Sequence, residues 1–218
     1  MNDYNNDNSP PSSGSDEPAV DVTDESIPAD ARAAIVRLLE EINYLRTEIQ
    51  ANNERIAELE NLADRDPLAP VVNRRAFVRE LERVKAYGER YGNTASLIYL
   101  DLNGMKSIND RFGHAAGDQT LLSVAEALVA NVRSSDLVGR LGGDEFGVIL
   151  SRADRKAAEE KAEILVQLVA GLEIRCDGNV IPVSLSYGIV ELAAHQNAEA
   201  ALAAADSAMY QRKKSLSS

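Results

Sequence analysis

Two glycines are followed by two acids at residues 142–145, and these residue types at this spacing are the ones in the sequence most suited to binding or catalysis. They lie between two apolar runs, residues 136–141 and 146–150, which are typical of β-strands joined by a tight turn. A glycine pair there predicts a two-residue type I′ hairpin, because both central positions of that turn need a positive φ. Asp144 and Glu145 repel each other at the hairpin tip, so they predict a cation site whose anionic partner is a phosphate.

A third acid, Asp101, stands near the end of an apolar run at residues 96–102, which is typical of a strand buried on both faces. If this strand neighbours the hairpin, the carboxylates of Asp101 and Asp144 reach the same edge of the sheet. Two carboxylates, completed by substrate phosphates and water, are the ligands that Mg²⁺ usually takes. Alternation along a strand puts Asp144 and Glu145 on opposite faces and predicts different roles for them. The alternative is an ordinary acidic turn beside a strand-ending acid.

The elements that position these acids follow from the periodicity of the apolar residues. The pattern predicts a loop between the strand at residues 96–102 and the next helix. Further elements are predicted as helices over residues 76–91, 117–133, 154–172 and 198–214, and strands over residues 172–176 and 180–192. This order predicts an α/β fold of the α+β sandwich type, with a central mixed sheet covered by helices.

A heptad pattern precedes the predicted domain and indicates a coiled-coil stalk over residues 30–65. Isoleucine recurs at the a positions and leucine at most d positions, which favours a parallel two-stranded coil. Asn52 stands at one d position, where a polar residue sets the register. The a and d residues are Ile35, Leu38, Ile42, Leu45, Ile49, Asn52, Ile56 and Leu59. The alternative is a single amphipathic helix that packs on its own domain.

Composition places the remaining limits on function. Residues 1–29 contain several acids and no Lys or Arg, which predicts a disordered acidic tail and leaves residues 66–218 as the folded domain. A net charge of −12 argues against DNA or RNA binding. The chain has no run of 18 apolar residues and no signal peptide, and its one cysteine, Cys176, suits a reducing compartment. We therefore expect a cytoplasmic protein without a membrane span.

Several motifs together resemble the GGDEF-domain diguanylate cyclases. The resemblance covers about residues 66–214 and rests on separate segments that agree in order and spacing. These segments are Asp66-Pro67-Leu68 with Asn73-Arg74-Arg75, Asp101-Leu102-Asn103 with Lys106, Asn109 and Asp110, Gly113-His114 with Gly117-Asp118, the Gly-Gly-Asp-Glu-Phe hairpin at residues 142–146, and Ala205-Asp206 with Ala208-Met209-Tyr210.

The resemblance implies an enzyme that condenses two GTP molecules into cyclic di-GMP and two pyrophosphates across a homodimer. It implies two Mg²⁺ ions in each half-site, with Mn²⁺ as an alternative. Their ligands would be Asp101, the backbone carbonyl of Leu102, Asp144 and Glu145. Either Asp144 or Glu145 would take the proton of the attacking hydroxyl, although a metal-bound carboxylate is a weak base.

The same resemblance assigns the substrate contacts. Asn109 and Asp118 would read guanine, because an Asp carboxylate accepts from the N1–H and N2–H groups and an Asn amide donates to an acceptor on the base. Lys106 would neutralise phosphate charge in the transition state, and Lys213 would hold the same polyphosphate. Ser217 stands where family members commonly carry a phosphate-contacting arginine, which predicts weaker GTP binding. The alternative is that Arg212 or Lys214 compensates for the missing arginine.

Arg133 and Asp136 stand just before the hairpin, where many family members carry an Arg-x-x-Asp site for product inhibition. The pair suits a guanine dinucleotide, because arginine offers a fork of donors and aspartate accepts from guanine. We therefore expect feedback inhibition by cyclic di-GMP. The alternative is a catalytically idle domain that binds GTP or cyclic di-GMP and signals through the stalk. The input signal, including any protein partner at the stalk or the acidic tail, is not encoded in a recognisable motif.

Overall fold

A computed structural model of the chain describes residues 28–176 and 178–216. The described residues fall into two units, which divide between Ala57 and Glu58. Nearly all of the predicted acidic tail, and Ser217, lie outside the described residues, so both predictions stay untested. Within the part of the chain that the structure describes, no helix combines the length and the apolar character that a membrane crossing needs.

Helix α1, which spans Ala29–Asp64, confirms the predicted N-terminal helix. Of its heptad residues, Leu38, Ile49 and Ile56 are exposed, at 58%, 59% and 52% of their full accessible surface. An apolar stripe of this kind is stable in water only when another surface covers it. The helix itself is therefore as expected, and its pairing into a coiled coil stays a prediction.

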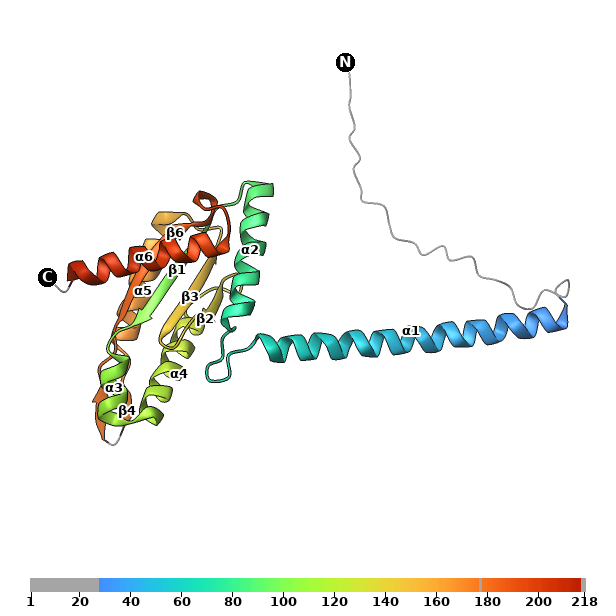
Figure 1. Ribbon diagram of the computed structural model, residues 1–218, viewed down its shortest axis with the longest axis horizontal. Helices are drawn as coiled ribbons and strands as arrows, with labels where there is room; N and C mark the ends of the chain where they lie inside the picture. The colour runs from blue at the N-terminus through green and yellow to red at the C-terminus, as the bar shows by residue number, and fades with distance from the viewer. Residues whose placement is uncertain (1–27, 177, 217–218) are drawn as a thin grey trace, which may run out of the picture. The chain divides into compact units, whose positions relative to one another are not determined.

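The second unit is built on a four-stranded sheet with the order β2-β3-β1-β6 (Figure 1). Every neighbouring pair in it is antiparallel, so the mixed sheet that we expected is wrong, while the α+β sandwich is confirmed. Strands that share a direction are kept apart, because β3 separates β1 from β2 and β1 separates β3 from β6. The strands are β1 (Ala95–Leu102), β2 (Leu137–Arg140), β3 (Glu145–Ser151) and β6 (Leu185–Glu191).

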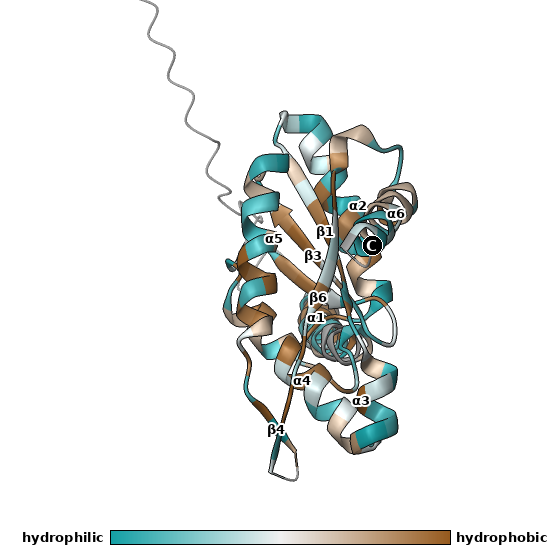
Figure 2. Cartoon of the chain, turned by 90° about the vertical axis from the view of Figure 1, so that its left-hand side faces the viewer, coloured by the Kyte–Doolittle hydropathy of each residue, from teal (hydrophilic) through white to brown (hydrophobic). Residues whose placement is uncertain are grey.

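Helices cover both faces of this sheet, and Figure 2 shows the strands between α5 on one side and α2 and α6 on the other. Side chains of β1 alternate between the two layers: Leu97 and Tyr99 pack with α2 and α6, and Ile98 and Leu100 pack with α4 and α5. The helices are α2 (Arg74–Tyr91), α3 (Met105–Phe112), α4 (His114–Ala130), α5 (Arg155–Ala170) and α6 (Ala198–Leu216).

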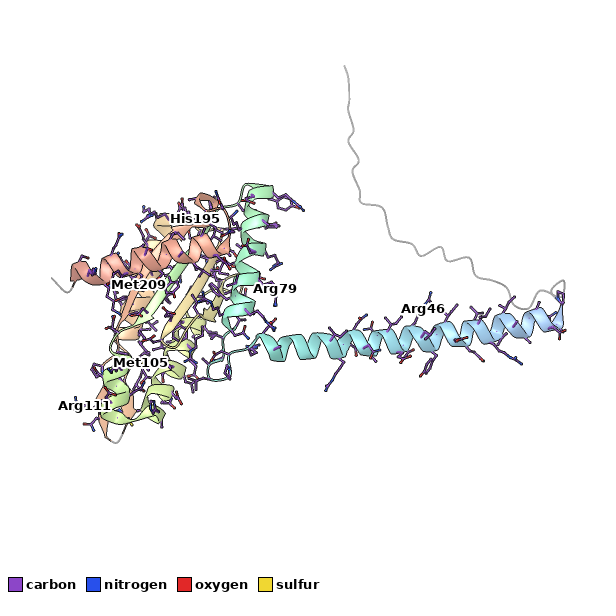
Figure 3. The ribbon with its side chains drawn as sticks, viewed as in Figure 1. Arg46, Arg79, Met105, Arg111, His195 and Met209 are labelled. Carbon is purple, nitrogen blue, oxygen red and sulfur yellow. The ribbon has the colours of Figure 1, made fainter. Side chains whose placement is uncertain are left out.

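Close packing on the α2 and α6 face depends on glycines in the strands. Phe77 of α2 is fully buried, and a Cβ on Gly139 or Gly147 would lie 2.5 Å from its ring. Met209 of α6, labelled in Figure 3, lies over β6, where a Cβ on Gly188 would come within 2.4 Å of the Met209 nitrogen. The three glycines let both helices approach the sheet closely.

The loop predicted after β1 is wrong, because it contains α3. This helix has two turns and buries only Met105 and Ile108, so its apolar signal is too short to read as a helix. Gly104 before it has a φ of 77° and Gly113 after it a φ of 83°, both in the left-handed region that favours glycine. The two glycines thus set the bounds of a short helix that periodicity alone does not reveal.

The strand predicted over residues 180–192 is divided in the structure. Its first part is β5 (Asn179–Ile181), which pairs with β4 (Ile174–Cys176) in a separate two-stranded sheet. Pro182 follows β5 and has no N–H group for a ladder, so the chain leaves this pairing before β6 begins at Leu185. A short 3₁₀ helix, Leu192–Ala194, then leads towards α6.

Candidate active site

The predicted metal ligands meet at one edge of the sheet, where β1 ends and β3 begins. Asp101 lies directly opposite Glu145 in the antiparallel register. Asp144 stands one residue before β3, and its carbonyl accepts a hydrogen bond of 2.9 Å from the Leu102 N–H. Opposite residues of such a pair have their Cβ atoms about 5 Å apart, so Glu145 is the direct neighbour of Asp101. The sequence predicts that Asp101 and Asp144 reach the same edge, and it does not identify Glu145 as the direct neighbour of Asp101.

The loop between β2 and β3, which contains Gly142, Gly143 and Asp144 and is called the signature loop below, is not the two-residue type I′ turn that we expected. Residues 141–144 connect the strands, and neither Gly142 nor Gly143 has a positive φ. Gly142 has another purpose, because a Cβ on it would lie 2.2 Å from Oε2 of Glu145. The glycine therefore makes room for the carboxylate of Glu145 at the sheet edge.

Arg140, the last residue of β2, holds this loop. Its Nε and Nη2 atoms donate to the Gly143 carbonyl at 3.2 and 2.7 Å, and its Nη1 lies 3.2 Å from Oδ1 of Asp66. The Arg140 and Asp66 side chains are only 15% and 11% exposed. The same Oδ1 accepts the backbone N–H groups of Leu68 and Ala69 at 3.0 and 2.9 Å. Asp66 thus fixes the conformation of residues 66–69, where the chain enters the domain, and, through Arg140, that of the signature loop.

Tyr99 is a second residue that sequence reasoning did not place in the site. It stands two residues before Asp101 and so faces the same side of β1, with 5% of its surface exposed. Burial, followed by the hydrogen bond and negative charge of Glu145, raises the pKa of Tyr99 far above its usual value. The hydroxyl therefore stays protonated and donates to the carboxylate of Glu145. The feature of the sequence that could have indicated this role is a tyrosine within an otherwise apolar strand.

The donors at this edge fit a magnesium site. Asp101, Asp144 and Glu145 offer carboxylates and Leu102 offers a carbonyl, which are the hard oxygen ligands that Mg²⁺ prefers. Among the residues that the structure describes, no three side chains of His, Cys, Asp or Glu are gathered into a ready metal cluster. Substrate phosphates and water must therefore complete the coordination shell, as is usual for Mg²⁺.

Lys213 reaches the same edge from the last turns of α6. Its ammonium forms an ion pair with Oδ1 of Asp101, a contact that the sequence does not predict. The Asp101 side chain is 15% exposed and the Lys213 side chain 41% exposed, so the pair lies at the boundary of the site. A single α6 lysine therefore contacts a predicted metal ligand and stands within the predicted phosphate site.

The two residues predicted to bind guanine lie side by side where α3 meets α4. Asn109 is on α3, Asp118 is on α4, and a Cβ on Gly117 would lie 1.9 Å from Oδ1 of Asn109. The glycine thus lets the Asn109 amide lie against the backbone next to Asp118. Lys106 is exposed in the first turn of α3, at the end nearer the acids.

Arg133 and Asp136, the predicted inhibitory pair, have a structural role in addition to any role in ligand binding. Asp136 accepts the Arg133 N–H at 3.1 Å and the Ser151 N–H at 3.2 Å, so its carboxylate closes the turn before β2 and ties it to β3. Both residues line an open cavity of about 430 Å³, and the Arg133 side chain is exposed there. Arg79, labelled in Figure 3, lines it from α2 and hydrogen-bonds Asp64, which holds the pKa of that carboxyl below its usual value.

The fold and this edge define the class of protein. Residues 63–217 match the family described as diguanylate cyclase, GGDEF domain, and the chain belongs to this family. Among curated relatives, it is 32% identical over 177 residues to the diguanylate cyclase DgcP of Pseudomonas aeruginosa, covering 81% of this chain and 26% of DgcP. It is 34% identical over 196 residues to TpbB of the same species, covering 86% and 45%. The chain thus spans less than half the length of these relatives.

Solved structures agree with the family assignment. The coiled coil and GGDEF domain of DgcB from Caulobacter crescentus, in complex with c-di-GMP, gives a TM-score of 0.72 at 25% identity and covers 82% of this chain and 95% of that one. The diguanylate cyclase SiaD from Pseudomonas aeruginosa, in complex with its activator SiaC, gives 0.67 at 28% identity and covers 84% and 73%. The likeness to DgcB and SiaD covers more than four-fifths of this chain.

Proposed function

We propose that this chain is a diguanylate cyclase, which joins two GTP molecules into cyclic di-GMP and releases two pyrophosphates. The observation that carries the proposal is the direct pairing of Asp101 with Glu145 at the edge of the sheet where Asp144 and Lys213 also lie. Carboxylates beside a lysine suit a nucleoside triphosphate bound with a divalent cation. The family and its named relatives support the same reaction.

Each residue of the site has a chemical role in this reaction. Asn109 and Asp118 bind the guanine edge, and Gly117 leaves the space that the Asn109 amide needs. Lys106 and Lys213 neutralise the phosphates as negative charge develops on the leaving pyrophosphate.

The acids at the sheet edge have two roles. Asp101, Leu102, Asp144 and Glu145 are the groups that would hold two Mg²⁺ ions, with Mn²⁺ as the alternative. When bound, these ions acidify the attacking ribose hydroxyl and screen the phosphates. The proton of that hydroxyl leaves to Asp144 or to Glu145, and Tyr99 fixes the orientation of Glu145.

The reaction requires two copies of the chain, because each GTP must present its 3′-hydroxyl to the α-phosphorus of the other. We infer that α1 supplies the second copy as a parallel coiled coil. The exposed Leu38, Ile49 and Ile56 support this, because pairing would cover them. A shared stalk raises the effective concentration of the second domain into the millimolar range. The stalk is also the surface that we propose for a protein partner in the cytoplasm.

Cyclic di-GMP is further proposed to inhibit the enzyme at Arg133 and Asp136. The cavity of about 430 Å³ beside them is open, and Arg65 and Arg79 also contribute to its lining. Guanidinium groups of this kind suit a ligand that carries phosphates. Because the Asp136 carboxylate already closes a turn, we expect Arg133→Ala to abolish inhibition without loss of basal activity. Arg175→Ala, at an exposed ion pair on β4, is the matched control and should keep inhibition.

The proposed activity is tested by incubating the purified chain with GTP and MgCl₂ and separating the nucleotides by chromatography. Wild-type protein should form cyclic di-GMP, and Asp144→Ala should form none while keeping its fold by circular dichroism. GTP that binds but stays unreacted would instead support the idle binding domain. Full turnover by Asp144→Ala would show that the site assignment is wrong.

A further inference from the structure

We propose that Lys213 competes with the divalent cation for Asp101, so that the cation binds more tightly together with the nucleotide than alone. This inference rests on the proposed site and extends it, because it assigns Lys213 a role before any phosphate is present. The lysine thereby couples the binding of the cation to the binding of GTP.

The direction of the Lys213 side chain carries the proposal. Three consecutive basic residues on α6 have three different partners. Arg212 stacks on the Tyr187 ring at 4.0 Å, and Lys214 lies 4.5 Å from the centre of the Tyr210 ring. Lys213 forms an ion pair with a carboxylate, and that carboxylate is Asp101. The helix thus directs one ammonium group at the sheet edge and its two basic neighbours elsewhere.

The electrostatics follow from this geometry. Asp101 lies near the end of β1 with 15% of its side chain exposed, so water screens its charge only in part. An ammonium on Oδ1 satisfies that charge and takes a position that a divalent cation needs, because both prefer the same carboxylate oxygens. A cation that arrives alone must displace Lys213 and leave two positive charges close together. Since the lysine side chain is 41% exposed, we expect the penalty to be modest, about three- to tenfold in cation affinity.

A triphosphate reverses the balance. Its oxygens offer Lys213 a more negative partner, and the flexible lysine side chain can rotate to exchange partners. Asp101 is then free for the cation, which the same phosphates also bind. Cation and nucleotide therefore bind with positive coupling, and the coupling is reciprocal because it is a free energy shared by two equilibria.

The test measures Mn²⁺ binding to the full chain in the absence of nucleotide, by titration calorimetry or by the loss of the free-ion paramagnetic resonance signal. Lys213→Met keeps the length of the side chain and removes its charge. We expect this variant to bind Mn²⁺ about three- to tenfold more tightly than wild type and to bind GTP in the presence of Mg²⁺ more weakly. Lys214→Met is the matched control and should change neither affinity.

Two outcomes would overturn the proposal. Unchanged or weaker Mn²⁺ binding by Lys213→Met would show that the lysine does not compete for Asp101. Tighter Mn²⁺ binding with unchanged GTP affinity would show that the lysine does not exchange to the phosphates. Asp101→Asn should weaken Mn²⁺ binding in both backgrounds, which places the measured ion at this carboxylate. Because the Mn²⁺ titration contains no nucleotide and needs no turnover, a failure of the proposed cyclase activity would be seen separately as GTP that stays unreacted.

Discussion

Replacing Arg140 by glutamine is expected to cost stability and, more strongly, catalysis. The substitution removes an ion pair with Asp66 at 3.2 Å and two hydrogen bonds to the Gly143 carbonyl at 3.2 and 2.7 Å. Removing one partner from a fully buried ion pair costs about 3–5 kcal/mol, and the 15% and 11% exposure of these side chains lowers our expectation to about 2–4 kcal/mol. The signature loop also loses its anchor, and a misplacement of about 1 Å typically lowers kcat about a hundredfold.

The assay combines urea unfolding with steady-state formation of cyclic di-GMP at saturating GTP. Asp66→Asn and the double variant complete a thermodynamic cycle, in which we expect a coupling of about 1–3 kcal/mol between the two side chains. Arg155→Gln is the matched control, because its ion pair with Glu159 is exposed and is expected to contribute less than about 1 kcal/mol. If Arg140→Gln lost stability but kept its kcat within twofold of wild type, Arg140 would not position the loop.

Three further substitutions test other parts of the structure. Gly117→Ala places a Cβ against Asn109, where 1.9 Å is available, and should raise the KM for GTP about tenfold with little change in kcat. Phe77→Ala empties a fully buried site between α2 and the sheet and should lower the free energy of unfolding by about 3–5 kcal/mol, measured in urea. Tyr99→Phe removes the donor to Glu145 but keeps the ring, so kcat/KM should fall about tenfold while the melting temperature changes little. An unchanged KM, an unfolding midpoint like that of wild type, or an unchanged kcat/KM would contradict the respective prediction.

The sequence predicts that Asp101 and Asp144 lie at the same edge of the sheet, because the ends of their strands can be recognised from the residue pattern. The apolar run before Asp101 and the glycine pair before Asp144 mark two strands, and adjacent strands bring their ends to one edge. Which acid faces Asp101 depends on register, and the connection of residues 141–144 shifts that place to Glu145. A pattern of period two cannot fix register when the length of the connecting loop is misread.

Other parts of the site depend on contacts between distant residues, and local patterns do not contain them. The pairing of Arg140 with Asp66 joins residues 74 positions apart, and that of Lys213 with Asp101 joins residues 112 positions apart. From the sequence alone, Gly117 is only a residue of low helix propensity. In the structure, its missing Cβ leaves the space that the Asn109 side chain occupies. Helix α3 shows the same limit on a smaller scale, because two buried residues are too few to reveal a period.

The most direct test of the central claim is the rate of cyclic di-GMP formation per chain, measured over a wide range of protein concentrations with GTP and MgCl₂. If two copies form one active site, the specific rate should rise with concentration and level off where light scattering shows the dimer. The products should then be one cyclic di-GMP and two pyrophosphates for every two GTP consumed. A fully dimeric sample that forms no cyclic di-GMP, or a specific rate that stays constant down to the monomer, would contradict the account.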